Sequence, residues 1–340
     1  MQISITLVLL ISLLTTACSF TSVAPDERPN WVNGQSKKYA SSHYLSGQGS
    51  ALTLDDAKDR ARSDLAKQFE VALKESSQQS QTFTSEQANG ETLNLLNQQI
   101  SRQLFTYTSR TLQGVEIADQ WYDPERDTHY ALAVLSRNKT RQRLEQELQK
   151  IDQQSHQRLL QAENEPSNLK RAALVQIAIN SQQKRIIIQS SLQVVDPSGF
   201  GKPANLSLAE LIRSRDALLI KVRIQPLASG DVSNELLKVV SGALAGVGFS
   251  INNNNFDYQL KVQTLLDPVI EKNGWFWLRG TMEINLIDTD GNSIGVHRWP
   301  LKVSSINLKR TQPKLITEVN RFLKEELRDV LLDFAVTIVT

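Results

Sequence analysis

The stretch 44-YLSGQGSALTLDDAKDRARSDLAKQF-69 predicts the architecture of the N-terminal part of the chain. Tyr44 and Leu45 have the character of the end of a β-strand, and Gly47 and Gly49 follow at a spacing typical of a tight turn. A helical pattern begins a few residues later. The order predicts a strand, a turn and a helix that packs against the sheet of that strand.

The helix predicted after this turn has a clear start and a clear buried face. Thr53 is a suitable N-cap, and Asp56 three residues later completes an approximate capping box. One face of the helix collects apolar residues at steps of three and four: Leu54, Ala57, Ala61, Leu65 and Phe69. The small alanines on this face predict close packing of the helix on a sheet.

The pattern changes after Phe69. Val71 and Leu73 continue an alternation of apolar and polar residues that is typical of a strand. The polar segment 76–92 is open to two interpretations, a strand with two polar faces or a loop. A second helix is expected over residues 93–108.

The next segment predicts a β-hairpin followed by long helices. Strands are expected over 114–123 and 129–137, on either side of a turn. From Thr140 a helical period continues into a polar extension, and Pro166 marks a break before a second amphipathic helix. The segment 152–205 is therefore expected to be a helical hairpin or a spacer.

The remaining part of the chain predicts a second α/β unit. The expected order is helix, strand, helix, three strands and a closing helix, over residues 206–215, 217–226, 233–247, 257–266, 275–288, 293–306 and 313–334. Gly248 is a suitable C-cap for the second of these helices, and Asp290-Gly291 is a strong signal for a hairpin turn. The order predicts a largely antiparallel sheet covered by helices.

Length and composition agree with an α+β protein of two small α/β modules, with mainly antiparallel sheets, joined by a helical segment. The chain has 340 residues, of which 40% are hydrophobic and 22% are charged. The 38 Lys and Arg residues nearly balance the 36 Asp and Glu residues. No run of basic residues predicts the concentrated positive face that nucleic acid binding needs, so nucleic acid is not an expected partner.

Cys18 is the only cysteine in the chain, and it follows a short apolar run over residues 3–14. The run is shorter than the roughly 20 apolar residues that cross a bilayer, but it has the length of a signal-peptide core. Residues 14–18, LTTAC, resemble the bacterial lipobox, which implies that the Cys18 thiol carries acyl chains such as palmitate. The alternatives are an ordinary cleavage site beside a buried cysteine, or a reactive thiol.

The residue after the cysteine bears on localisation. Ser19 stands where the lipoprotein-sorting pattern has Asp for retention at the inner membrane, so the outer membrane is expected, with the domains in the periplasm or on the surface. The expected organisation is a lipoprotein signal peptide, a tether, an N-terminal lipoprotein domain, a helical connector and a C-terminal α/β domain, over 1–17, 18–28, 29–151, 152–205 and 206–340.

Motifs between residues 29 and 150 resemble a known family when they are taken together. The motifs are Pro29-x-Trp31, Tyr44-Leu45-x-Gly47-x-Gly49, the alanine-spaced helix, Val115-x-Ile117-x-Asp119-x-Trp121 and Tyr130-Ala131-Leu132-Ala133. They resemble the bacterial outer-membrane lipoproteins of the LPP-twenty type, which includes the flagellar protein FlgP. The resemblance implies a small α+β domain and a role in outer-membrane or flagellar assemblies. The C-terminal half faintly resembles the α/β module at the N-terminus of periplasmic TolB.

No motif in the sequence predicts catalysis, a metal site or a cofactor. The four histidines have no zinc-type spacing, and no serine lies in a nucleophile elbow. His129 and His297 fall in predicted strands beside aromatic residues, where a structural role is expected. Trp31, close to the tether, is expected to anchor the start of the domain rather than to bind a ligand.

The densest aromatic cluster is Trp275-Phe276-Trp277, in a predicted strand. The alternation of a strand places Trp275 and Trp277 on one side and Phe276 on the other. Two interpretations are open. The two tryptophans belong to a packed core, or they bind a partner protein or a glycan ring.

The sequence favours a lipid-anchored envelope protein without enzymatic activity, which assembles with itself or with outer-membrane or flagellar machinery. Its expected partners are the outer membrane, through the acyl anchor, and envelope proteins, with a homo-oligomer among the options. One alternative is a periplasmic activator of a cell-wall synthase, which the helical connector would help to reach its target. The other is an envelope glycan-binding protein, which the tryptophan pair would serve.

Overall fold

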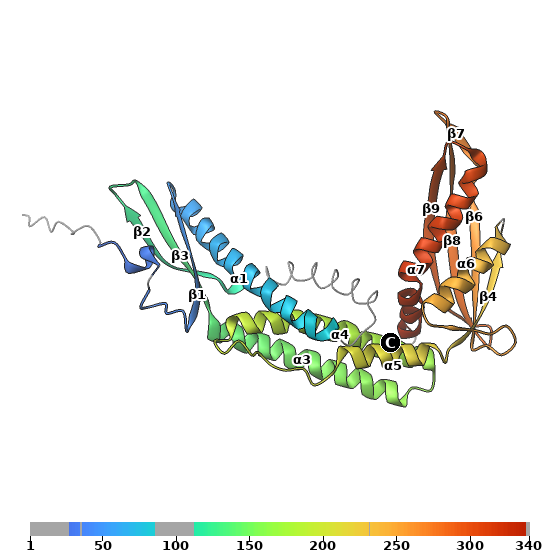
Figure 1. Ribbon diagram of the computed structural model, residues 1–340, viewed down its shortest axis with the longest axis horizontal. Helices are drawn as coiled ribbons and strands as arrows, with labels where there is room; N and C mark the ends of the chain where they lie inside the picture. The colour runs from blue at the N-terminus through green and yellow to red at the C-terminus, as the bar shows by residue number, and fades with distance from the viewer. Residues whose placement is uncertain (1–26, 35, 86–111, 231, 338–340) are drawn as a thin grey trace, which may run out of the picture. The chain divides into compact units, whose positions relative to one another are not determined.

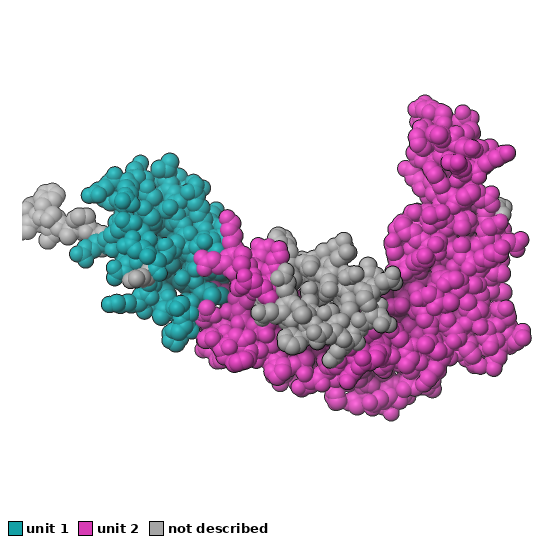
Figure 2. Space-filling view, viewed as in Figure 1, with its two compact units in different colours: residues 1–65, 115–134 teal, residues 66–114, 135–340 magenta. Residues whose placement is uncertain are grey.

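The computed structural model describes residues 27–34, 36–85, 112–230 and 232–337 and has an α+β fold, as predicted (Figure 1). The chain divides into two compact units (Figure 2). The first comprises residues 1–65 and 115–134, and the second comprises residues 66–114 and 135–340. Two of the three boundaries between the units, after Leu65 and after Val134, fall inside regular elements, a helix and a strand.

The first unit contains a three-stranded sheet in the order β1-β3-β2. Its strands are β1 (Tyr44–Ala51), β2 (Glu116–Asp123) and β3 (Thr128–Ser136), with the short 3-10 helices η1 (Asn30–Asn33) and η2 (Leu112–Gly114, in the second unit) in the chain before β1 and β2. Strands β2 and β3 form the predicted antiparallel hairpin. Asp127 closes it with a positive φ of 48°. The hydrophobic core of this sheet includes Trp31, Leu132 and Val134.

Helix α1 (Leu54–Ser85) begins as predicted. The Thr53 hydroxyl accepts a hydrogen bond from the backbone N–H of Asp56 at 3.2 Å, which is one half of the predicted capping box. The Asp56 carboxylate accepts its bond from the Thr53 hydroxyl, at 2.7 Å. Ala57, Ala61 and Leu65 are buried along one face. The start and the packed face of this helix therefore follow from the local sequence.

The prediction of a tight turn at Gly47 and Gly49 is wrong, because both residues lie inside strand β1. Because they have no Cβ atom, the two glycines leave space for the backbone of α1. A Cβ atom on Gly47 would lie 2.6 Å from the backbone oxygen of Ala61, and one on Gly49 would overlap the backbone of Ala57 and Ala61. The glycines and alanines therefore let the backbones of β1 and α1 approach closely.

The strand predicted after Phe69 is also wrong, because α1 continues to Ser85. Leu65, Phe69 and Leu73 are all buried and follow one another at steps of four, while Val71 is exposed. The helical period therefore explains the burial better than the alternation of a strand. Of the segment left open between strand and loop, 76–85 is helical; the rest, like the helix expected over 93–108, lies outside the described residues.

Two antiparallel helices make the predicted helical hairpin. They are α3 (Arg137–Asn164) and α4 (Asn168–Val195), each with a serine N-cap, Ser136 and Ser167, and Pro166 lies in the break between them. The Gln182 side-chain amide donates to the Ser155 hydroxyl at 3.0 Å inside the pair. The buried Arg185 guanidinium bonds the Asp152 carboxylate at 2.7 Å.

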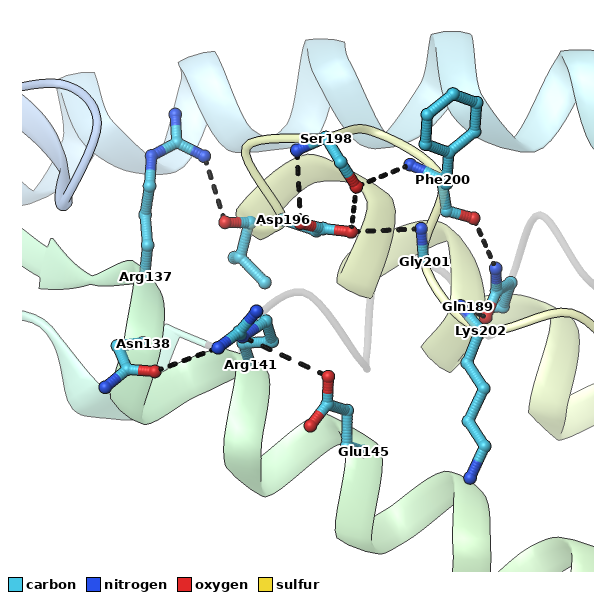
Figure 3. A network of polar contacts seen from close by, with 11 residues as sticks. Arg137, Asn138, Arg141, Glu145, Gln189, Asp196, Ser198, Phe200, Gly201 and Lys202 are labelled. Carbon is cyan, nitrogen blue, oxygen red and sulfur yellow. Dashed lines mark hydrogen bonds and ion pairs between the residues drawn. The ribbon is translucent and has the colours of Figure 1, made fainter.

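The loop after α4 is held by a polar network at the start of α3 (Figure 3). Arg137 donates to the carbonyl oxygens of Val194 and Val195 at the end of α4. The Asp196 carboxylate accepts hydrogen bonds from the Ser198 hydroxyl and the Gly201 amide, and the hydroxyl bond lowers the pKa of Asp196. The network closes the C-terminal end of α4 and orders the loop that leads to α5.

The second unit continues with α5 (Leu208–Leu219), α6 (Ser233–Gly246) and a six-stranded sheet, and ends in η3 (Leu308–Arg310) and α7 (Thr311–Thr337). The strands are β4 (Arg223–Ser229), β5 (Ser250–Ile251), β6 (Tyr258–Leu266), β7 (Ile270–Lys272), β8 (Trp275–Asp288) and β9 (Ser293–Ser305). The predicted strand over 217–226 starts only at Arg223, because α5 extends through the buried residues Leu218 and Leu219.

The C-terminal sheet is largely antiparallel, as predicted, with one parallel part. Strands β6, β7 and β9 all pair antiparallel with β8, whereas β4 pairs parallel with β5 and β6. Helix α6 provides the crossover that a parallel connection requires. Helices α6 and α7 pack on one face of the sheet. The buried face of α7 contains Leu315, Val319, Leu323, Leu327 and Leu331.

Candidate functional site

The predicted lipidation residue, Cys18, lies outside the described residues, so its modification stays a prediction. Trp31 follows shortly after the predicted tether and is buried. Its indole N–H donates to the Asp119 carboxylate at 3.0 Å, and its carbonyl oxygen accepts a bond from the Gln48 side chain. Trp31 thus joins η1 to β1 and β2, which is the structural role expected from the sequence.

The other two candidate residues, Trp275 and Trp277, lie at the start of β8. Side chains of β8 alternate between two faces. Leu278 and Met282 lie on the buried face with Phe276, whereas Trp275 and Trp277 lie on the face that carries polar residues such as Glu283. Trp275 is 43% exposed, so the prediction that it belongs to a packed core does not describe its side chain.

The two tryptophans are positioned by a tight turn that was not predicted from the sequence. Lys272 pairs with Trp275, so Asn273 and Gly274 form a two-residue hairpin loop. Both have positive φ, 54° and 74°, as a type I′ turn requires. The Asn-Gly pair between two apolar runs is the signal that would have predicted this hairpin.

The tryptophans line an open groove of about 440 Å³. Its lining residues are Asp267, Pro268, Ile270, Lys272, Asn273, Trp275, Trp277 and Arg279. The combination of indole rings and charged side chains could accommodate a ligand with an apolar body and an anionic group. The structure therefore brings Trp275 and Trp277 together in one binding-competent surface.

Basic side chains flank these aromatic rings. The Lys302 ammonium lies 5.4 Å from the centroid of the Trp277 ring, within the range of a cation–π contact. Lys302 comes from β9, where it pairs with Arg279 of β8. Two cations therefore lie beside each other on the open face of the sheet, next to the groove.

The histidines do not contribute to this groove. The rings of His129 and Tyr122 have centroids 4.7 Å apart, and those of His297 and Trp299 are 4.4 Å apart. These aromatic contacts fit the structural role expected for both histidines. Within the described ranges, there is no cluster of three or more side chains suited to hold a metal ion.

The described helices were also compared with the requirements of a membrane span. Among residues 27–337, apart from the gaps at 35, 86–111 and 231, no helix is both long and apolar enough to cross a bilayer.

Comparison with known proteins identifies the N-terminal part of the chain. The model of the LPP20 lipoprotein family matches residues 29–136, which confirms the predicted resemblance. The match covers β1, α1, β2 and β3, including the close-packed glycines and alanines. A comparison with curated proteins finds no match.

Several solved structures are similar to parts of the chain. A secreted protein of Helicobacter pylori is 12% identical, with a TM-score of 0.42, and the alignment covers 83% of this chain and 96% of that one. A minor lipoprotein of Acinetobacter baumannii is 18% identical over 35% of this chain and 89% of its own, with a TM-score of 0.23. Lipoprotein GNA1162 of Neisseria meningitidis is 13% identical over 30% and 97%, with a TM-score of 0.23. Residues 29–136 of the chain are thus similar to the LPP20 lipoprotein family, on the match of the family model.

Proposed function

We propose that the chain is a lipid-anchored protein of the bacterial cell envelope that acts by assembly with other envelope proteins or with itself, not by catalysis. The observation that carries this proposal is the LPP20 match, which begins only eleven residues after the lipobox cysteine, Cys18. Each buried CH₂ of an acyl chain contributes about 0.8 kcal/mol, so several chains on Cys18 would give a stable anchor.

The strand edges are poor surfaces for such assembly. Strand β2, at one edge of the N-terminal sheet, carries an irregularity between Ile117 and Asp119. Strand β9, at one edge of the C-terminal sheet, contains Pro300 between the charged residues Arg298 and Lys302. Bulges, prolines and charges are the devices that prevent edge-to-edge pairing. Docking through faces is therefore the better hypothesis.

Two separate variants, with substitutions at the neighbouring positions 18 and 19, test the acyl anchor. Cys18→Ser removes the acyl acceptor, so palmitate labelling and membrane association are expected to be lost. Ser19→Asp keeps the acceptor but introduces the inner-membrane retention signal, so labelling should persist while the protein moves from the outer-membrane to the inner-membrane fraction. A Cys18→Ser protein that stays labelled and membrane-bound would refute the anchor.

Assembly is tested by light scattering on the purified protein with Cys18→Ser, and by crosslinking in cells on the protein that keeps Cys18. A defined oligomer, or a crosslink to an outer-membrane or flagellar protein, supports the proposal. A monomer that crosslinks to no envelope protein contradicts it. A crosslink to a cell-wall synthase would favour the alternative of a periplasmic activator, and calorimetric binding of an envelope glycan would favour the other alternative.

A further inference from the structure

Exposed apolar side chains gather at one end of the C-terminal sheet. We call this end, formed by residues 265–279 and 302–314, the β7 end. Of the sixteen large hydrophobic side chains exposed among the described residues, six lie here: Leu265, Val269, Ile270, Trp275, Ile306 and Leu308. They are between 40% and 72% exposed. The other ten are spread over the remaining elements, so the concentration is specific to this end.

The strand register brings these residues together. Ile270 pairs with Trp277, and two residue pairs separate them from the Asn273-Gly274 turn. On the other side of β8, Phe276 pairs with Ser305, and Ile306 is the next residue along the chain. The apolar residues of the β6–β7 segment and those after β9 therefore flank the same end of β8. Figure 1 shows the start of α7 at this end, beside β7.

The charge of the β7 end is strongly positive, although the whole chain is nearly neutral. Its two segments contain six basic residues and two acidic ones, Asp267 and Glu271. The basic residues are Lys272, Arg279, Lys302, Lys309, Arg310 and Lys314. Because they come from the strands and from the start of α7, they surround the apolar residues rather than extend as one run.

We propose that the β7 end is a second membrane-contact surface, which inserts its apolar side chains among the headgroups of an anionic bilayer. An aromatic ring and aliphatic side chains surrounded by Lys and Arg match the layers of such an interface. Trp is favoured at headgroup depth, aliphatic groups reach the acyl chains, and cations bind anionic lipids. The surface is separate from the acyl anchor at Cys18.

The charge and the apolar groups both favour a lipid occupant over the alternatives. A second copy of this chain would bring its own basic residues against these, and like charges repel. A glycan would stack on Trp275 or Trp277 but would leave Ile306 and Leu308 without apolar partners. An anionic bilayer satisfies the rings, the aliphatic groups and the cations at once.

The test uses the mature chain, residues 18–340, with Cys18→Ser, so that no acyl chain contributes. It is sedimented with vesicles of phosphatidylcholine alone or mixed with phosphatidylglycerol. We expect binding to the mixed vesicles, and a decrease in binding as salt is raised. The double variant Ile270→Ser with Ile306→Ser should bind about tenfold or more weakly, because two aliphatic groups no longer leave water.

The two controls are Phe200→Ser and Lys221→Glu, at exposed residues of the same unit that lie outside the β7 end. Phe200→Ser removes an apolar side chain that is 81% exposed in the loop before α5, and it should leave binding unchanged. Lys309→Glu with Arg310→Glu should weaken binding to mixed vesicles about tenfold or more, whereas Lys221→Glu should have little effect. Circular dichroism checks that each variant is folded.

The proposal is overturned if the chain does not sediment with mixed vesicles, or if the isoleucine variant binds as well as the parent chain. Equal binding to neutral and anionic vesicles would also contradict the role of the basic residues. Binding of an envelope glycan that the isoleucine variant retains would identify a sugar site instead. Because every sample lacks the acyl anchor, none of these outcomes bears on the proposal for Cys18.

Discussion

Single glycines show how closely the N-terminal domain is packed. Gly47 and Gly49 lie in β1 opposite Ala57 and Ala61 of α1, where a Cβ on either glycine would collide with helix backbone. Backbone atoms of a helix cannot rotate away as a side chain can, so strand and helix would have to separate. The close packing of α1 on β1 therefore requires residues without a Cβ atom at both positions.

Gly49→Ala is expected to destabilise the protein by about 3 kcal/mol or more, through overpacking against α1. The measurement is urea denaturation followed by circular dichroism. Gly242→Ala is the matched control, because Gly242 lies in helix α6 with open space where its Cβ would be. That change should stabilise the protein by about 0.5–1 kcal/mol. Equal effects of the two substitutions would refute this account of β1 and α1.

Asp257 provides a residue-scale test of pH dependence. Its carboxylate accepts bonds from the side chain and the backbone N–H of Arg223, at 2.6 Å and 2.9 Å, and the guanidinium contact lowers the pKa of Asp257. A lowered pKa contributes stability above the unfolded value of about 3.9, and that stability is lost as pH falls through the folded pKa.

Asp257→Asn should therefore reduce the free energy of unfolding by about 1 kcal/mol at pH 7, a modest amount because both side chains are partly exposed. The difference from the parent chain should begin to narrow below about pH 4, where the unfolded carboxylate takes up a proton, and should be smallest below the lowered pKa of the native carboxylate. Urea denaturation at both pH values measures it. Asp59→Asn, which removes an exposed pair with Arg62, should have a smaller effect at either pH. A difference that stays constant with pH would contradict the assigned cause.

At the scale of elements, the α3–α4 hairpin depends on a buried ion pair. Arg185 of α4 bonds Asp152 of α3 and also donates to the carbonyl oxygens of Lys202 and Pro203 in the following loop. One guanidinium thus connects two helices and the segment that leads to α5. Loss of its carboxylate partner would leave a buried charge only partly compensated.

Asp152→Ala is expected to cost about 2–3 kcal/mol in the free energy of unfolding, because Arg185 is almost completely buried. Glu145→Ala in the same helix removes an exposed pair with Arg141 and should cost at most about 0.5 kcal/mol. Both values come from urea denaturation. If Glu145→Ala costs as much as Asp152→Ala, the buried ion pair is not the cause of the destabilisation.

Elements also differed in how well they could be predicted. Helix α7 and strand β8 followed their periodic patterns, because one face of each is buried and the other is not. Strand β3 was predicted as a strand although residues 131–135 are buried on both of its faces. The prediction failed at Phe69, where apolar residues at steps of two and four satisfy both a strand and a helix. For Trp275 the sequence left a packed core and a binding surface open, because periodicity identifies the two faces of a strand but not which face a helix will cover.

At the scale of the whole molecule, we expect the anchor to determine location and not folding. Among the residues that the structure describes, the buried ones lie between Trp31 and Ala335, so we expect an acyl chain at Cys18 to contribute to neither core. Mature Cys18→Ser protein should have the same midpoint of thermal unfolding as the lipidated protein in detergent. A markedly lower midpoint for the unlipidated chain would show that the anchor also supports the fold.

The local pattern of residues was enough to predict the α+β class, the capped start of α1, helices on both sides of Pro166 and most strands. These features depend on side-chain periodicity, capping and turn chemistry over a few neighbouring residues. Long-range packing decided the rest. Gly47 and Gly49 are points of close approach because α1 packs back onto β1. The β7 end is apolar and basic because the strand register joins two segments, 265–279 and 302–314, that are separate in the sequence. No local pattern encodes contacts between residues that are distant along the chain.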